Sequence, residues 1–85
     1  MTKHTHDEHE LTTAAFLWTR GFKLQGVIDD PGRRSHKIFQ FEDDGRIGPA
    51  VIEYLNGGSV PARDYARSIS ELKTLVYQNS KPTME

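Results

Sequence analysis

The sequence predicts an α+β fold in which a β-hairpin packs against two or three helices, in the order α-β-β-α-(β)-α. Apolar residues recur at helical spacing across residues 60–78, the longest run of this kind. Over residues 22–29 and 35–42 they instead alternate with polar residues, which is the pattern of strands with one buried face. A Pro-Gly pair between the two alternating runs indicates the turn of a hairpin.

The composition is that of one small globular domain. The 85 residues are 35% hydrophobic and 27% charged, which leaves room for one modest core. The 11 basic and 12 acidic residues give a net charge of -1, which disfavours a domain that binds nucleic acid mainly through phosphates. The chain has no cysteine, which excludes disulfides and thiolate chemistry, and we expect a cytoplasmic protein. No apolar run approaches the roughly 20 residues that a membrane span needs, so we expect no membrane contact.

The two ends of the chain are polar. Residues 1–10 contain no apolar segment, so they are predicted to be a disordered tail and not a secretory signal. The single domain is expected over residues 11–79. Residues 80–85 are expected to be a flexible C-terminus.

The first helix is predicted over residues 13–20. Thr12 is a suitable N-cap, and Leu11 before it can pack against Phe16 as a hydrophobic staple. Gly21 is expected to end the helix, because glycine accepts the left-handed conformation of the residue after a helix.

The hairpin is predicted to bury a face rich in phenylalanine. Alternation along the first strand places one set of residues inward: Phe22, Leu24, Gly26 and Ile28. The second strand adds Phe39 and Phe41, and this face must pack on helices because a lone hairpin is marginal in water. The outer face then carries Val27, Ile38 and His36. With the exposed strand edges, this face suggests a homodimer.

A second helix is predicted after the turn at residues 43–45, and two starts remain open. Its apolar residues are Ile47, Val51, Ile52, Tyr54 and Leu55. If Asp44 is the N-cap, Pro49 removes a hydrogen bond of the helix. If Gly48 is the N-cap, Pro49 occupies the first helical position, where proline is tolerated.

The next segment leads into the longest helix. Gly57 and Gly58 are expected to end the second helix, and Ser59-Val60 is either a loop or a short third strand. Pro61 suits the first position of the last helix. One stripe of this helix is apolar and is predicted to cover the phenylalanines of the hairpin: Tyr65, Ile69, Leu72 and Val76.

Four segments carry a resemblance: AAFLWTRGFKLQGV, KIFQFEDD, IEYLNGG and VPARDYARSISELKTLVY, within residues 11–78. They resemble a small bacterial and mobile-element family known only as a domain of unknown function. The matching positions are mostly core, cap and turn residues. The resemblance therefore implies an intracellular or phage-encoded protein and transfers no activity. Lys73 is the one matching polar residue that packing does not explain.

The sequence offers little that suggests chemistry. His4, His6 and His9 are the only residues clustered like metal ligands, but a flexible tail cannot fix their geometry, so we expect adventitious affinity and no metal site or cofactor. The aspartate pairs at residues 29–30 and 43–44 are interpreted as turn and cap residues. No motif supplies a nucleophile or a phosphate loop, so we expect no enzyme.

The sequence thus predicts a non-enzymatic binding module that acts through protein–protein contact, either with itself or with another partner. One alternative is a nucleic-acid-binding accessory domain that uses a basic hairpin and the last helix. A second alternative is a binder of a small molecule or nucleotide. The candidate binding residues lie on the hairpin and the last helix: Arg33, Arg34, His36, Lys37, Arg63, Arg67, Ser70 and Lys73.

Overall fold

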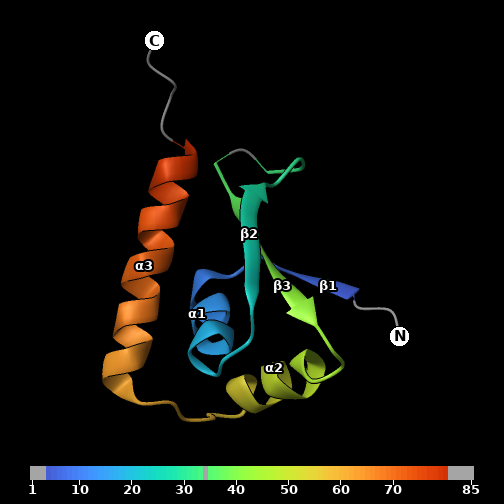
Figure 1. The fold of residues 1–85 in the computed structure, drawn as a ribbon, viewed down its shortest axis with the longest axis vertical. Helices are drawn as coiled ribbons and strands as arrows, with labels where there is room; N and C mark the ends of the chain where they lie inside the picture. Colours follow the sequence, from blue (N-terminus) through green and yellow to red (C-terminus); the bar gives the residue numbers. More distant parts are fainter. Residues whose placement is uncertain (1–3, 34, 81–85) are drawn as a thin grey trace.

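The computed structural model describes residues 4–33 and 35–80 and confirms the α+β fold. Its elements are β1 (His4–Glu8), α1 (Leu11–Thr19), β2 (Leu24–Asp29), β3 (Lys37–Asp43), α2 (Ile47–Leu55) and α3 (Ala62–Ser80). The strands form one antiparallel sheet in the order β1-β3-β2. Helix α1 lies between α3 and the sheet and contacts both other helices (Figure 1).

The N-terminal segment, predicted to be a disordered tail, contains strand β1. This strand pairs with β3, so that His6 lies opposite Phe41 and Glu8 opposite Phe39. The prediction was wrong because strands pair through backbone groups, which residues 4–8 supply whatever their side chains are. Ser59-Val60, left open between a loop and a short strand, is a loop.

Strands β2 and β3 form the predicted hairpin, but a β-bulge in β2 turns the side chains that follow it to the opposite face of the sheet. The pairing register shifts by one residue between Leu24 and Gly26. Val27 consequently lies opposite Phe39 and packs against the core, whereas Ile28 is 42% exposed. The predicted facing of Val27 and Ile28 was therefore wrong, because alternation in a sequence does not reveal an inserted residue.

The core lies where α1, the sheet, α2 and α3 meet. Its largest fully buried side chains are Phe16, Phe41, Leu17, Ile47 and Leu72. The predicted stripe of α3 faces this core, with Leu72 fully buried and its other members packed around it. The stripe packs largely against α1, and a hydrogen bond from Thr19 Oγ1 to Ser68 Oγ, 2.9 Å long, joins the two helices.

Helix α1 begins two residues earlier than predicted and ends one residue earlier, with Arg20 as its C-cap before the predicted Gly21. Glu10 precedes its first residue, so Thr12 lies inside the helix and is not the N-cap. At the other end, Gly21 has a φ of 98°. The Phe22 N–H donates to the Leu17 carbonyl at 3.1 Å, which is the hydrogen bond of a Schellman ending.

Helix α3 runs through Ser80, so the expected flexible C-terminus begins inside this helix. The rest of that expected segment, residues 81–85, lies outside the described residues. Among the helices that the structure describes, none is long and apolar enough to cross a membrane.

Helix α2 starts at Ile47 with Arg46 as its N-cap, between the two starts left open by the sequence. Pro49 is then in the first turn, where its missing N–H has no partner inside the helix to lose. At the C-terminal end, the Gly58 N–H donates to the Glu53 carbonyl at 2.8 Å. A Cβ atom at Gly58 would lie 2.7 Å from Glu53 Cγ and 2.9 Å from Glu53 O.

We therefore expect Gly58→Ala to destabilise the domain by about 1–3 kcal/mol, because the added methyl forces this turn away from Glu53. Gly48→Ala is the matched control, since a Cβ atom there meets nothing within 4 Å. Alanine is also favoured over glycine inside a helix, so the control should keep or raise stability. Urea unfolding of both variants checks this expectation, and equal free energies of unfolding would contradict it.

Candidate binding surfaces

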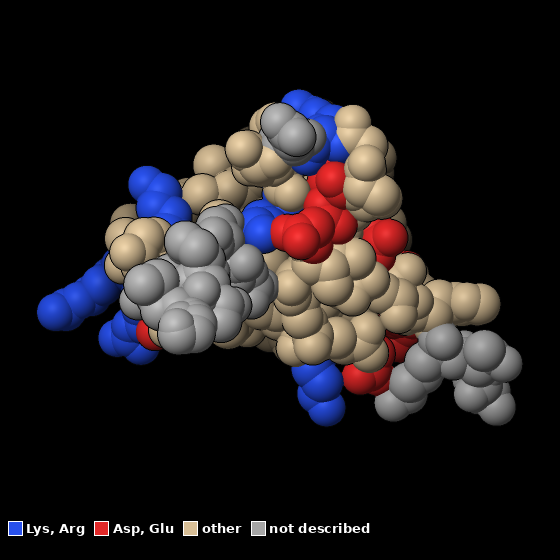
Figure 2. All heavy atoms as spheres, turned by 90° about the horizontal axis from the view of Figure 1, so that it is seen from above, with Lys and Arg blue, Asp and Glu red and all other residues tan. Residues whose placement is uncertain are grey.

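The predicted binding residues do not form one surface. His36, Lys37 and Lys73 line the same groove. Arg33 lies exposed in the β2–β3 loop, and Arg34 falls outside the described residues. Arg63, Arg67 and Ser70 are exposed on α3, on the side opposite its buried stripe. Figure 2 shows the basic side chains in separate groups on the face seen there, with acidic side chains between some of them.

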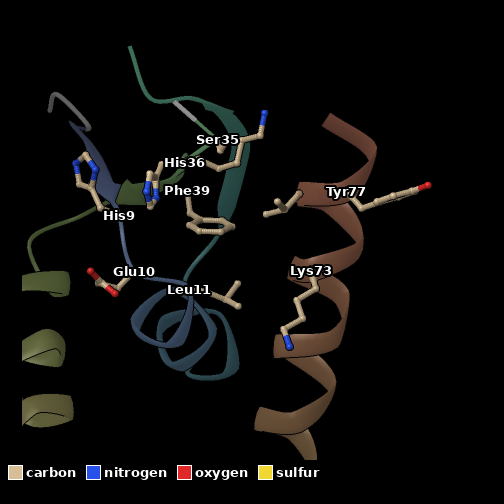
Figure 3. A pocket seen from close by; sticks show the side chains of 10 residues that line it. His9, Glu10, Leu11, Ser35, His36, Phe39, Lys73 and Tyr77 are labelled. Carbon is tan, nitrogen blue, oxygen red and sulfur yellow. The ribbon is translucent and has the colours of Figure 1, made fainter. Parts of the chain in front are cut away.

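The groove lined by His36, Lys37 and Lys73 lies between the hairpin and the C-terminal half of α3. We call it the hairpin–α3 groove. Its volume is about 510 Å³, and its lining residues are His9, Glu10, Leu11, Ser35, His36, Lys37, Phe39, Lys73, Val76 and Tyr77. Figure 3 shows Leu11 and Phe39 pointing toward α3, whereas the Tyr77 ring points away from the groove. The centre of the groove is thus apolar.

Most of the basic side chains around this groove have partners. The Lys37 side chain is 7% exposed and forms an ion pair with Asp29. His9 Nδ1 lies 3.5 Å from Asp30 Oδ2. Arg33 Nη2 donates to His36 Nε2 at 3.5 Å. Lys73 differs, because no carboxylate of residues 4–33 or 35–80 forms an ion pair with it.

A second surface lies on α2 and was not assigned as a site from the sequence. Ile47 and Ala50 face the core, but Ile52 is 58% exposed and Leu55 is 70% exposed. Together with the exposed Gly48 and Pro49, these two side chains define the α2 outer face. The sequence did contain a signal for it, since the apolar residues of this nine-residue helix are too many for one buried stripe.

An uncharged groove adjoins the α2 outer face at Leu55, and we call it the α2–α3 groove. Its volume is about 600 Å³, and it is lined by Phe16, Tyr54, Leu55, Gly57, Gly58, Ser59, Val60, Ala62 and Tyr65. The Tyr65 hydroxyl donates to the Thr12 carbonyl at 3.2 Å. Burial raises the pKa of this hydroxyl, and the neighbouring Tyr54 raises it further. The groove therefore stays uncharged at neutral pH.

An ion pair fixes α2 against the end of α1. Arg20 Nη1 donates to Glu53 Oε1 at 3.1 Å, Arg20 Nη2 donates to the Ser59 carbonyl at 3.0 Å, and the guanidinium lies 4.7 Å from the centre of the Phe16 ring. The hydrogen bonds from Arg20 hold the pKa of the Glu53 carboxyl below its usual range and raise the pKa of Arg20. Through these contacts Arg20 links α2, which carries the α2 outer face, and the loop at Ser59 to the end of α1.

The lowered pKa of Glu53 predicts a pH dependence. Its stabilising effect is fully present above the carboxyl pKa of the unfolded chain, and it is lost as pH falls through the lower pKa of the folded state. We expect Glu53→Gln to lower the thermal midpoint at neutral pH and to differ less from the wild type in acid. Thermal unfolding across the acidic range checks this, and a difference in midpoint that does not depend on pH would contradict it.

Three of the four paired aspartates have the turn or cap roles predicted for them, whereas Asp29 ends strand β2 and pairs with Lys37. Asp30 Oδ1 accepts a hydrogen bond from the Gly32 N–H at 2.9 Å, and Asp43 Oδ1 accepts one from the Gly45 N–H at 2.8 Å. Asp44 pairs with Arg46, and the hydrogen bond between their side chains lowers the pKa of Asp44. These carboxylates therefore bond to neighbouring groups of their own turns.

The N-terminal histidines have separate surroundings. His6 Nε2 donates to Glu8 Oε1 at 2.9 Å, while His9 faces Asp30 of the β2–β3 loop. In the part of the chain that the structure describes, no group of three or more histidine and acidic side chains is placed to hold a metal ion. The adventitious affinity of His4, His6 and His9 stays a prediction.

Comparison with known proteins gives a family and no function. A family model described as Domain of unknown function (DUF5659) matches residues 3–78. No curated protein matches the chain, and no solved structure does. The match includes the segment of β1, in addition to the residues on which the resemblance rested.

Proposed function

This protein belongs to the family of domains of unknown function DUF5659, and we propose that it is a non-enzymatic binding module that acts through protein–protein contact at the α2 outer face. The cytoplasmic location and the bacterial or mobile-element origin are further parts of this proposal. They rest on the cysteine-free composition and on the family resemblance.

The exposure of Ile52 and Leu55 carries the proposal. Single exposed apolar residues are common on protein surfaces and need no explanation. Here two large ones share one side of a short helix, and Leu55 also borders the uncharged α2–α3 groove. Fully burying one such side chain is worth about 1.5–3 kcal/mol, so a partner that covers both gains a substantial free energy.

The surface is also held in place before any partner arrives. Arg20 fixes α2 through Glu53, and Gly58 closes the turn that follows the helix. A contact surface on a fixed element loses less conformational entropy on binding than one on a mobile loop. This rigidity supports a role in recognition.

A second copy of the chain is the partner that we propose. The α2 outer face has no charged residue, so it can meet its own copy without repulsion, and a two-fold interface brings the same patch of both copies together. Leu55 of each copy could enter the α2–α3 groove of the other. The hairpin face favoured from the sequence is a poorer surface, because Val27 packs in the core and Ile38 is 6% exposed.

The nucleic-acid alternative from the sequence gains no comparable support. A nucleic-acid interface needs several cations that act together on phosphates. Here Lys37 is paired with Asp29, and the exposed arginines of α3 lie away from the hairpin–α3 groove.

Sedimentation equilibrium tests the proposed self-association. We expect the wild type to form dimers at micromolar concentrations, and the double variant Ile52→Glu with Leu55→Glu to be a folded monomer. The matched control is Thr74→Glu with Gln78→Glu, which adds the same charge on the exposed side of α3 and should remain dimeric. A monomeric wild type, or a dimer that survives in the Ile52 and Leu55 variant, would overturn this proposal.

A further inference from the structure

The hairpin–α3 groove lies apart from the proposed contact surface and shares no lining residue with the α2–α3 groove. We propose that it binds a small amphipathic acid, with an apolar body seated in the groove and one carboxylate paired with Lys73.

The size and lining of the groove fit a small organic ligand. Its volume of about 510 Å³ falls within the range of about 300–1,000 Å³ that is usual for ligand pockets. The apolar lining comes from three different elements: Leu11 is on α1, Phe39 on β3 and Val76 on α3. In Figure 3 the side chains of Leu11 and Phe39 are directed across the groove toward α3.

The charges around the groove favour the binding of an anion beside Lys73. Lys37 is already neutralised by Asp29, and His9 lies beside Asp30. The Glu10 carboxylate points away from Lys73 (Figure 3). Lys73 is thus a cation of this groove that no carboxylate of the described residues neutralises, and its side chain runs along the groove side of α3 (Figure 3).

One such cation beside an apolar groove matches a ligand with one acidic group. A polyanion such as a nucleic acid would need several cations in register. A neutral apolar ligand would leave Lys73 without a partner. The carboxylate of an aliphatic or aromatic acid fits both the single charge and the apolar lining, because the ammonium group donates charge-assisted hydrogen bonds to it.

Two-dimensional ¹H–¹⁵N NMR titration with decanoate and with 2-naphthoate tests this proposal and distinguishes an aliphatic from an aromatic ligand. For at least one of the two acids we expect saturable shifts centred on Leu11, Phe39 and Val76. The neutral alcohol 2-naphthalenemethanol is the uncharged probe and should bind more weakly. Higher salt should weaken binding of the acid more than binding of the alcohol.

Single substitutions distinguish the contribution of the Lys73 charge to binding from that of the apolar lining. Lys73→Met should weaken binding of the acid roughly five- to tenfold with little effect on the alcohol, whereas Lys73→Arg should preserve binding of the acid. Arg67→Met removes the same charge from the same helix outside the groove and should change neither affinity. Both lysine variants should fold, because Lys73 is exposed.

Three outcomes would overturn the proposal. One is that neither acid produces saturable shifts at the groove. Another is that the shifts centre on α2, which would indicate general apolar affinity. The third is that Lys73→Met binds the acid as tightly as the wild type does. The first and third outcomes leave the proposed dimer untouched, since the groove and Lys73 lie outside the α2 outer face.

Discussion

Leu72→Asp unfolds the domain at neutral pH. Leu72 is the one α3 residue in the fully buried core among the described residues, and it belongs to the same cluster as Phe39 and Phe41 of the sheet. The substitution removes this packing, which costs about 2–5 kcal/mol even for alanine, and it buries a carboxylate without a partner, which costs several more. A domain of this size has a total stability of about 5–10 kcal/mol, so the folded state does not survive.

Far-UV circular dichroism and thermal unfolding measure this effect. Thr74→Asp is the matched control, since it adds the same carboxylate two residues away on the exposed side of α3. We expect the control to change the free energy of unfolding by no more than about 0.5 kcal/mol. A Leu72→Asp variant with the thermal midpoint of the wild type would show that α3 does not cover the core.

Deletion of residues 1–8 is expected to have the second largest effect on folding. It removes β1, whose backbone pairs with β3 from His4–Asp43 to Glu8–Phe39. The loss of these hydrogen bonds at roughly 1 kcal/mol each destabilises the domain by about 2–4 kcal/mol. It also leaves β3 as an unprotected edge, so the truncated chain should tend to aggregate.

Urea unfolding of the truncated and full-length chains distinguishes a strand from a tail. A disordered tail can be removed with almost no change in the free energy of unfolding. Asp7→Asn is a useful control, because it changes the charge of β1 and leaves the backbone able to pair with β3. If the truncated chain were as stable as the full-length protein, β1 would not be part of the folded domain.

Features governed by local chemistry could be predicted from the sequence. Gly21 and Gly57 end their helices with positive φ values of 98° and 84°, as the glycine after each apolar run indicated. The buried stripe around Leu72 followed from helical periodicity alone. The Asp30 and Asp43 turns were recognised for the same reason, since each aspartate bonds to the backbone two residues ahead.

Features that depend on distant parts of the chain could not be predicted in this way. β1 has no apolar alternation, and it is a strand because β3 lies beside it. The bulge before Gly26 changes the facing of Val27 without any change in composition. Exposure of Ile52 depends on which side of α2 the rest of the domain covers. The hairpin–α3 groove forms only when residues far apart in sequence, such as Leu11 and Lys73, come together.

Site-specific disulfide cross-linking tests the central claim most directly, because the chain has no cysteine of its own. Ile52→Cys places a thiol in the α2 outer face, where a two-fold contact brings it close to its copy. Thr74→Cys places one on the exposed side of α3, away from that contact. Under mild oxidation we expect a covalent dimer of the Ile52→Cys protein and a monomer of the Thr74→Cys protein. Equal cross-linking of the two variants, or none at residue 52, would contradict a contact through the α2 outer face.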